Sequence, residues 1–171
     1  MEQAIATLKA AGATVVDVQV PTYNQWNQPE FEVLLYEFKD GLNAYLKKSG
    51  SAHASLEALI AWNKANATQV MPIFGQEIFT TSQERGELTD ETYLKALRLI
   101  KNTTQYGINS AIENNKLDAI VSPTGGTWGM SAIAGYPHIT VPSGFVDGIP
   151  IGLAFFGKAF SEPTLIKFAY A

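Results

Sequence analysis

The sequence predicts an α/β fold in which a β-sheet is covered by helices and only part of the sheet lies within this chain. Three observations support this prediction. A long middle region carries apolar residues at helical spacing, whereas residues 117–157 hold short apolar runs between Pro and Gly. Charged residues make up only 16% of the 171 residues and apolar residues 46%. That balance suggests more buried surface than a separate domain of this size usually has.

The N-terminal segment predicts a short helix followed by a strand. Apolar residues recur at helical spacing over residues 4–11, and Gly12 stands where a left-handed C-cap would end the helix. In the following "TVVDVQVP", valines alternate with polar residues up to a proline. Such alternation is typical of a half-buried strand, so residues 14–20 are predicted as the first of four strands.

Residues 30–115 are predicted to form a helical insertion. One apolar stripe gives a long helix over residues 30–48, and another gives a helix over 89–115. Between them, Ser55 can cap a further helix. The stripe on the first of these helices is rich in aromatic residues, and we expect it to belong to the core.

The other predicted strands form a strand cluster over residues 117–157. They are the apolar runs 117–121, 138–141 and 151–156. Continuous apolar runs of this length are typical of strands that are buried on both faces. The chain then begins a last helix, with Ser161 as the expected cap and Pro163 in its first turn.

Composition argues against several functional classes. A net charge of −4, with Lys and Arg scattered, argues against nucleic-acid binding. No apolar run reaches the roughly 20 residues that span a bilayer, so no membrane partner is expected. The absence of Cys excludes disulfides, thiolate metal sites and a Cys nucleophile. The two histidines lie far apart in sequence, and we therefore expect no metal site.

His138 is the candidate base for an autonomous serine hydrolase. Such an enzyme needs a serine within hydrogen-bond reach of the base, and an acid that orients it. Ser122 and Ser143 end neighbouring predicted strands, and Asp118 or Asp147 could supply the acid. Neither serine lies in a G-x-S-x-G turn, so nothing in the sequence indicates an activated hydroxyl. This hydrolase is one alternative function.

The segment "SPTGGTWG" directly follows a predicted strand, and α/β sheets place ligands at the carboxyl ends of their strands. It lacks the glycine spacing of a phosphate-binding loop. A flexible loop with a tight turn is one interpretation, and a pocket wall is the other. The candidates for that wall, which would bind substrate, are Ser122, Thr124, Gly125 and Trp128.

Seven segments carry a family resemblance in their order along the chain. They are "LKAAGATVVDVQVP", "VLLYEFKDGLNAYL", "SLEALIAWN", "FGQEIF", "LDAIVSPTGG", "AGYPHITVPSGF" and "GIPIGLAFFGKAFSEPTLIKFAYA". Together they resemble the C-terminal third of the amidase signature family, and more narrowly its peptide-amidase-like bacterial branch. The resemblance implies a mixed β-sheet between helices, and hydrolysis of a carboxamide without metal or cofactor. The stretch between Trp128 and Ala134 is shorter than in the family, as is the final helix.

The family's catalytic set is a Ser, a cis-Ser and a Lys, with an oxyanion hole in a Gly/Ser-rich loop. A loop of the Gly-Gly-Ser-Ser-Gly type is absent from this sequence, and no lysine from Lys9 to Lys167 matches the catalytic one. The resemblance therefore implies the C-terminal part of an amidase, which completes the sheet and walls the substrate cleft. By itself this chain is expected to be inactive.

The partners that this interpretation implies are the N-terminal portion of the same protein and an amide substrate, either a small molecule or a peptide. We also expect the separate chain to self-associate through exposed strand edges and apolar surface. A bacterial cytoplasmic location is the expectation for the parent. A free-standing, non-catalytic binding module is the second alternative function.

Overall fold

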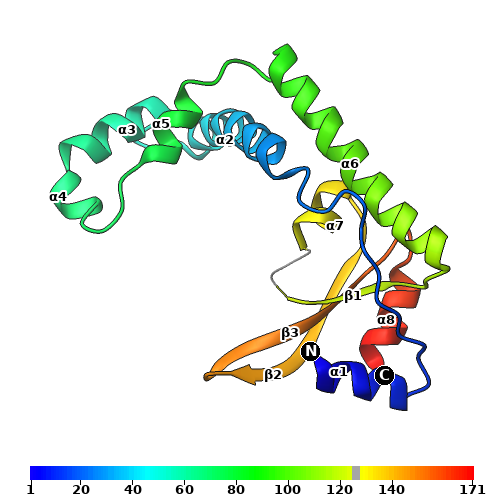
Figure 1. Ribbon diagram of the computed structural model, residues 1–171. Coiled ribbons are helices and arrows are strands. Elements are labelled where there is room, and N and C mark those ends of the chain that lie inside the picture. The colour runs from blue at the N-terminus through cyan, green and yellow to red at the C-terminus, as the bar shows by residue number, and fades with distance from the viewer. Residues whose placement is uncertain (125–127) are drawn as a thin grey trace. The chain divides into compact units, whose positions relative to one another are not determined.

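The computed structural model describes residues 1–124 and 128–171, and they form two compact units (Figure 1). The sheet unit comprises Met1–Trp26 and Ile100–Ala171, and the helical unit comprises Asn27–Leu99. The strands are β1 (Ile120–Pro123), β2 (His138–Val146) and β3 (Ile149–Phe156). The helices are α1 (Glu2–Ala10), α2 (Asn27–Ser49), α3 (Leu56–Ala65), α4 (Ala67–Val70), α5 (Glu77–Gln83), α6 (Glu91–Asn115), α7 (Trp128–Ala134) and α8 (Glu162–Tyr170).

The sheet is antiparallel, with β3 between β1 and β2. Phe156 on β3 lies opposite both Ile120 on β1 and His138 on β2, which fixes the register. The three apolar runs predicted within the strand cluster are therefore confirmed as strands. Their ends differ from the prediction: β1 begins three residues later, and β2 continues to Val146.

The β2–β3 hairpin extends beyond β1 as a two-stranded ribbon (Figure 1). Its two-residue turn is Asp147 and Gly148, with φ of 51° and 79°. Positive φ at both positions defines a type I′ turn, which matches the twist of the flanking strands and is favoured by Asp-Gly. The register shifts between Pro142 and Gly144, so β2 carries a bulge at Ser143.

The predicted strand over residues 14–20 is wrong. No strand is assigned to this segment, because no other described residues pair with it, and alternation fixes which face is apolar but supplies no ladder partner. The segment leads instead to α6, where the Thr22 hydroxyl donates to the carbonyl of Thr103 at 2.8 Å. Gly107 leaves room there for Val20 and Thr22, since a Cβ would overlap Thr22 Oγ1 and press on Val20.

Helices α1 and α8 cover one face of the sheet. Leu153 and Phe155 on β3 form a buried cluster with Leu165 on α8, and Leu8 on α1 packs against it. Gly12 has a φ of 96°, which confirms the left-handed position predicted after α1. In α8 the proline lies in the first turn as predicted. Ser161 precedes that helix, but its hydroxyl donates back to the Lys158 carbonyl at 2.8 Å and does not cap the helix.

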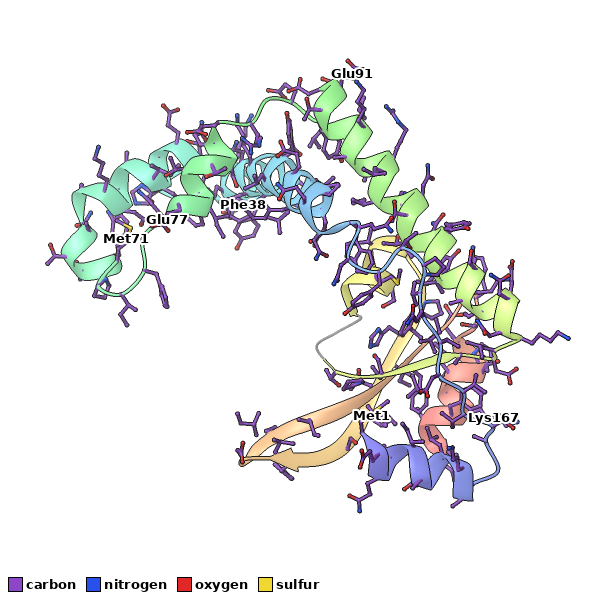
Figure 2. All side chains as sticks on the ribbon, in the orientation of Figure 1. Met1, Phe38, Met71, Glu77, Glu91 and Lys167 are labelled. Carbon is purple, nitrogen blue, oxygen red and sulfur yellow. The ribbon has the colours of Figure 1, made fainter. Side chains whose placement is uncertain are left out.

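In the helical unit, α2 packs on α3 and α5, and the Phe38 and Phe79 rings lie 5.3 Å apart (Figure 2). Ser55 caps α3 as predicted, since its hydroxyl accepts a hydrogen bond from the N–H of Ala58 at 3.1 Å. The expectation that the whole aromatic stripe of α2 is core is only partly right. Leu35 is fully buried, whereas Tyr45 is 66% exposed.

The reason lies in two tyrosines that turn the buried side of α2 toward the end of α5 and the start of α6. The Tyr36 hydroxyl donates to Asp90 at 3.3 Å, and the Tyr93 hydroxyl donates to Glu37 at 2.8 Å. Burial and the nearby carboxylates raise the pKa of both phenols. Among the described residues, none of the helices combines the length and apolar character needed to cross a membrane.

Candidate functional site

The face of the sheet opposite α1 and α8 carries hydroxyl side chains. Ser122 on β1 and Thr140 on β2 both lie opposite Ala154 of β3, so they occupy one row across the sheet. Residues two apart along a strand share a face, so His138 lies on the same face as Thr140, one row further along β2. The centre of the serine–threonine row is a small side chain, Ala154, so no bulky group stands between its two ends.

The next row begins where β1 ends. The N–H of Thr124 donates to the carbonyl of Gly152 at 3.0 Å, which continues the β1–β3 pairing by one residue. A Cβ on Gly152 would overlap Thr124 Oγ1 on one side and Thr140 Cγ2 on the other. Thr124 and Thr140 are exposed, whereas Ser122 is 7% exposed. We call Ser122, Thr124 and Thr140, above Ala154 and Gly152, the hydroxyl floor.

Of the four candidate wall residues, the structure brings Ser122 and Thr124 together on the hydroxyl floor. Trp128 is the first residue of α7, and Gly125 lies outside the described residues. Sequence reasoning missed Thr140. The signal that could have found it is the alternation of β2, which places Thr140 on the face shared with His138. Substrate binding by these residues stays a prediction.

His138 is hydrogen-bonded to a serine that the sequence did not suggest. Its Nδ1 lies 2.8 Å from Oγ of Ser131 on α7. Its ring stacks on Phe156, with centroids 5.9 Å apart and planes 12° apart. Burial lowers the pKa of His138 below its ordinary value. Ser131 is fully buried, so no substrate can reach its hydroxyl.

The expected pairing of His138 with Ser122 or Ser143 is wrong. Ser143 lies five residues further along β2, which corresponds to about 17 Å at about 3.3 Å per residue. Ser122 lies two strands away across β3, at least about 10 Å at the usual strand spacing. Asp147, one of the two acids considered, is in the hairpin turn at the far end of β2. Direct hydrogen bonding within such a triad is therefore impossible here.

The turn after α7 brings Ser131 and His138 together. Gly135 has a φ of 72°, its N–H donates to the Ala132 carbonyl, and the N–H of Tyr136 donates to the Ser131 carbonyl at 2.9 Å. These two bonds form a Schellman motif, the common ending of a helix at a left-handed glycine. A proline then prevents the helix from continuing, and the chain turns into β2. The Gly-Tyr-Pro sequence was a local signal for this ending.

Helix α6 holds the same turn from the other side. Gln105 donates from Nε2 to the Ala134 carbonyl at 3.0 Å, and Asn109 donates from Nδ2 to the Tyr136 hydroxyl oxygen at 3.0 Å. The C-terminal end of α7 is therefore fixed by side chains of α6, and its middle by His138.

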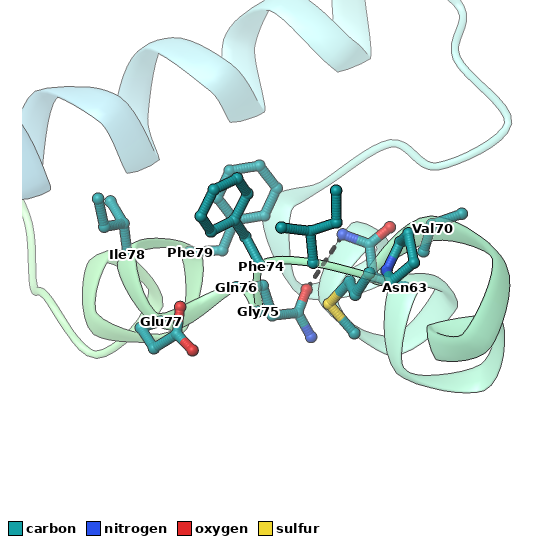
Figure 3. A pocket seen from close by; sticks show the side chains of 11 residues that line it. Asn63, Val70, Phe74, Gly75, Gln76, Glu77, Ile78 and Phe79 are labelled. Carbon is teal, nitrogen blue, oxygen red and sulfur yellow. Dashed lines mark hydrogen bonds between the residues drawn. The ribbon is translucent and has the colours of Figure 1, made fainter.

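The helical unit has a pocket of its own, of about 640 Å³ (Figure 3). It is lined by Asn63 and residues 70–79, most of them apolar. The two amides in it are paired: Asn63 donates to Gln76 Oε1 at 3.1 Å, and Gln76 donates to the Ile60 carbonyl at 3.1 Å. The lining offers apolar contact surface and no arrangement of a nucleophile with a base. Over residues 1–124 and 128–171, no cluster of three His, Cys, Asp or Glu could hold a metal ion.

Comparison with known proteins gives a consistent result. A probable amidase of Arabidopsis thaliana is 38% identical over 179 aligned residues, which cover all of this chain and 35% of that protein. The native peptide amidase of Stenotrophomonas maltophilia matches with a TM-score of 0.93 and 40% identity, over 99% of this chain and 38% of that chain. One glutamyl-tRNA(Gln) amidotransferase subunit, from Staphylococcus aureus, is 29% identical over 99% of this chain and is covered to 39%. No family model matches the chain.

These relatives are amidases or an amidotransferase subunit, and the match in sequence extends to the whole described fold. The chain therefore belongs to the amidase signature family, as a C-terminal portion with an α/β fold. Within that family its fold is close to that of peptide amidase. The chain spans between a third and two fifths of the length of the relatives it matches.

Proposed function

We propose that this chain is the C-terminal part of an amide-bond hydrolase, in which it completes the sheet and walls one side of the substrate cleft. The observation that carries this proposal is the end-to-end similarity to amidases that are almost three times as long. We assign all 171 residues to one amidase-like domain, with the helical insertion over about 30–115 and the strand cluster over about 117–157.

The wall is assigned to Ser122, Thr124, Gly125 and Trp128, and Thr140 joins them from the neighbouring edge strand. The hydroxyl floor supports this assignment, because exposed threonines over a glycine can approach a flat amide group closely. A threonine hydroxyl can donate to an amide oxygen or accept from an amide N–H, so these side chains suit a carboxamide in either orientation. The substrate class is accordingly a small carboxamide or a peptide amide.

The nucleophile and the proton-transfer groups are assigned to the missing N-terminal portion. Within this chain His138 is engaged by a buried serine, and Ser122 and Ser143 lie out of its reach. Amide hydrolysis needs an activated nucleophile and donors for the oxyanion, and their removal costs several orders of magnitude in rate. The separate chain is therefore expected to be inactive, and its proposed partner is the N-terminal portion of the same protein.

The test is reconstitution. The chain is purified by itself, and also produced together with the protein segment encoded immediately upstream. Ammonia release from simple carboxamides and from peptide amides is measured for both. We expect no release above the buffer rate from the chain by itself, and turnover from the combined protein. Turnover by the separate chain would contradict the proposal, and a stop codon directly before Met1 would favour the free-standing binding module.

A matched pair of variants tests the wall. Thr124→Val replaces the hydroxyl with a methyl group of similar size, and Thr164→Val makes the same change on α8. In the combined protein, we expect Thr124→Val to raise KM or lower kcat about tenfold, as the loss of one hydrogen bond to substrate typically does. Thr164→Val should leave both constants unchanged. Equal activity of the two variants would remove Thr124 from the cleft.

A further inference from the structure

Helix α7 depends on its contacts with the rest of the sheet unit. It has seven residues, fewer than an isolated helix needs to be stable in water. Two contacts bury its middle and end: Met130 and Ser131 are both fully buried, and Ala134 is 4% exposed. The orientation of α7 is therefore set by what Met130 and Ser131 contact.

The contact of Ser131 is directional in a way that the contact of Met130 is not. A methionine side chain is flexible and fills space in several conformations. The Ser131 hydroxyl lies 2.8 Å from Nδ1 of His138, and the stacking of that ring on Phe156 fixes the direction in which Nδ1 points. Phe156 is itself fully buried at the centre of the sheet. The hydrogen bond therefore relates the rotation of α7 about its axis to the sheet.

The same helix carries one end of the proposed wall. Trp128 begins α7, three residues before Ser131, and Thr124 ends the pairing with β3 on the other side of residues 125–127. A rotation or shift of α7 on the sheet would displace Trp128 relative to Thr124. The ring of His138 is neutral at neutral pH, because its burial lowers the pKa. No charged side chain contributes to that lowering, so the bond to Ser131 does not compete with an ion pair.

We propose that His138, acting through Ser131, is a positioning residue that sets α7 and with it the Trp128 side of the substrate cleft. The inference rests on the proposed function, because the wall matters only if the protein hydrolyses an amide. His138 takes no part in proton transfer to the substrate: its Nδ1 is engaged by a buried hydroxyl, and its role is to hold a helix. It is required as a hydrogen-bonding group at the Nδ1 position.

Three variants separate the hydrogen bond from the bulk of the ring. Ser131→Ala removes the hydroxyl with the smallest change in volume. His138→Asn keeps a polar group near the position of Nδ1, whereas His138→Gln carries its amide out to the position of Nε2. We expect Ser131→Ala and His138→Gln each to lower kcat/KM of the combined protein about tenfold, since small displacements of positioning groups have large effects on rate. His138→Asn should stay within about threefold of the unsubstituted protein.

The double variant Ser131→Ala/His138→Gln provides a further criterion. Residues that act through one hydrogen bond are not additive, so the double variant should lose no more than either single variant. Losses that multiply to about a hundredfold would overturn the proposal. Equal losses in His138→Asn and His138→Gln would also overturn it, because the ring and not its Nδ1 bond would then be needed.

A second readout needs no activity. The chain is labelled with 5-fluorotryptophan, and the fluorine resonance of Trp128 is identified with the variant Trp128→Phe. We expect this resonance to move in Ser131→Ala and in His138→Gln but not in His138→Asn. The resonance of Trp62, which belongs to the helical unit, is the internal control and should stay in place.

An unmoved Trp128 resonance in Ser131→Ala would overturn the proposal, even if His138→Gln failed to fold. The two proposals fail in different ways. If the unsubstituted combined protein released no ammonia, the proposed function would fail, and the fluorine resonance would still report whether His138 positions α7.

Discussion

Thr124 and Gly152 meet where β1 ends, with the threonine N–H donating to the glycine carbonyl at 3.0 Å. The Thr124 side chain occupies the space that a Cβ on Gly152 would need. Thr140 approaches the same space from β2, so the position is closed on two sides. Gly152 is therefore a residue whose missing side chain shapes the hydroxyl floor.

The first prediction follows from this contact. Gly152→Ala should lower the free energy of unfolding by about 1–3 kcal/mol, because the added methyl group must displace Thr124 or Thr140. Urea unfolding measures the change. Gly41→Ala on α2 is the control, since nothing lies within 4 Å of its Cβ position. There, replacing a helical glycine should stabilise the protein by about 0.5–1 kcal/mol. A neutral Gly152→Ala would mean that the two threonines can move aside freely.

The second prediction concerns the pH dependence that His138 causes. Its folded pKa lies below its value in the unfolded chain, so the unfolded state binds the proton more readily. Stability should therefore decrease as the pH falls from about 7.5 through about 6.5 toward the lower, folded pKa. Urea unfolding at several pH values, compared with His138→Asn, measures this part of the dependence. Identical pH profiles for the two proteins would contradict the prediction.

The third prediction concerns the buried phenol of Tyr93. Tyr93→Phe removes a hydrogen bond to Glu37 and should lower the free energy of unfolding by about 1 kcal/mol near pH 7. The raised pKa of Tyr93 adds a pH effect: above about pH 10 the unfolded state loses the phenol proton first, so stability should decrease as the pH rises. The difference between the two proteins should shrink over that range. A constant difference up to about pH 11 would show that Tyr93 ionises equally in both states.

The fourth prediction concerns the tip of the β2–β3 hairpin. Phe145 is 75% exposed and Ile149 66%, and an exposed apolar ribbon promotes association. We expect the separate chain to self-associate at micromolar concentration, as measured by light scattering. Phe145→Ser and Ile149→Thr together should reduce the apparent mass at equal concentration. A monomer at all concentrations in the unsubstituted chain would show that these side chains are not adhesive.

Local sequence signals predicted the features that depend on neighbouring residues. The glycine after α1, the Ser55 cap and the apolar runs of β2 and β3 were all predicted, because caps, turns and short strands are set within a few residues. Residues 14–20 have the alternation of a strand, and yet they form none. Alternation determines which side chains would face a core, whereas a strand also needs a partner that the sequence does not name.

The site was predictable only in part. Ser122 and Thr124 were suggested by their place after a strand, which is a local property. The pairing of Ser131 with His138 depends on a Schellman turn and on the stacking of the histidine against Phe156, and the latter is a contact between distant strand positions. The exposed Tyr45 on α2 has the same cause in reverse. Helical spacing identified an apolar stripe, but hydrogen bonds from Tyr36 and Tyr93 decided which side of the helix is buried.

The bulge in β2 has a consequence for how such a chain could aggregate. β2 is an edge strand, and an uninterrupted edge is a template on which further strands can add without limit, as in amyloid. Pro142 has no N–H to offer, and the bulge at Ser143 breaks the regular repeat directly beside it. The proline and the bulge thus act as a gatekeeper in the middle of the strand. Association of the chain should stop at small oligomers and produce no fibrils that bind thioflavin T.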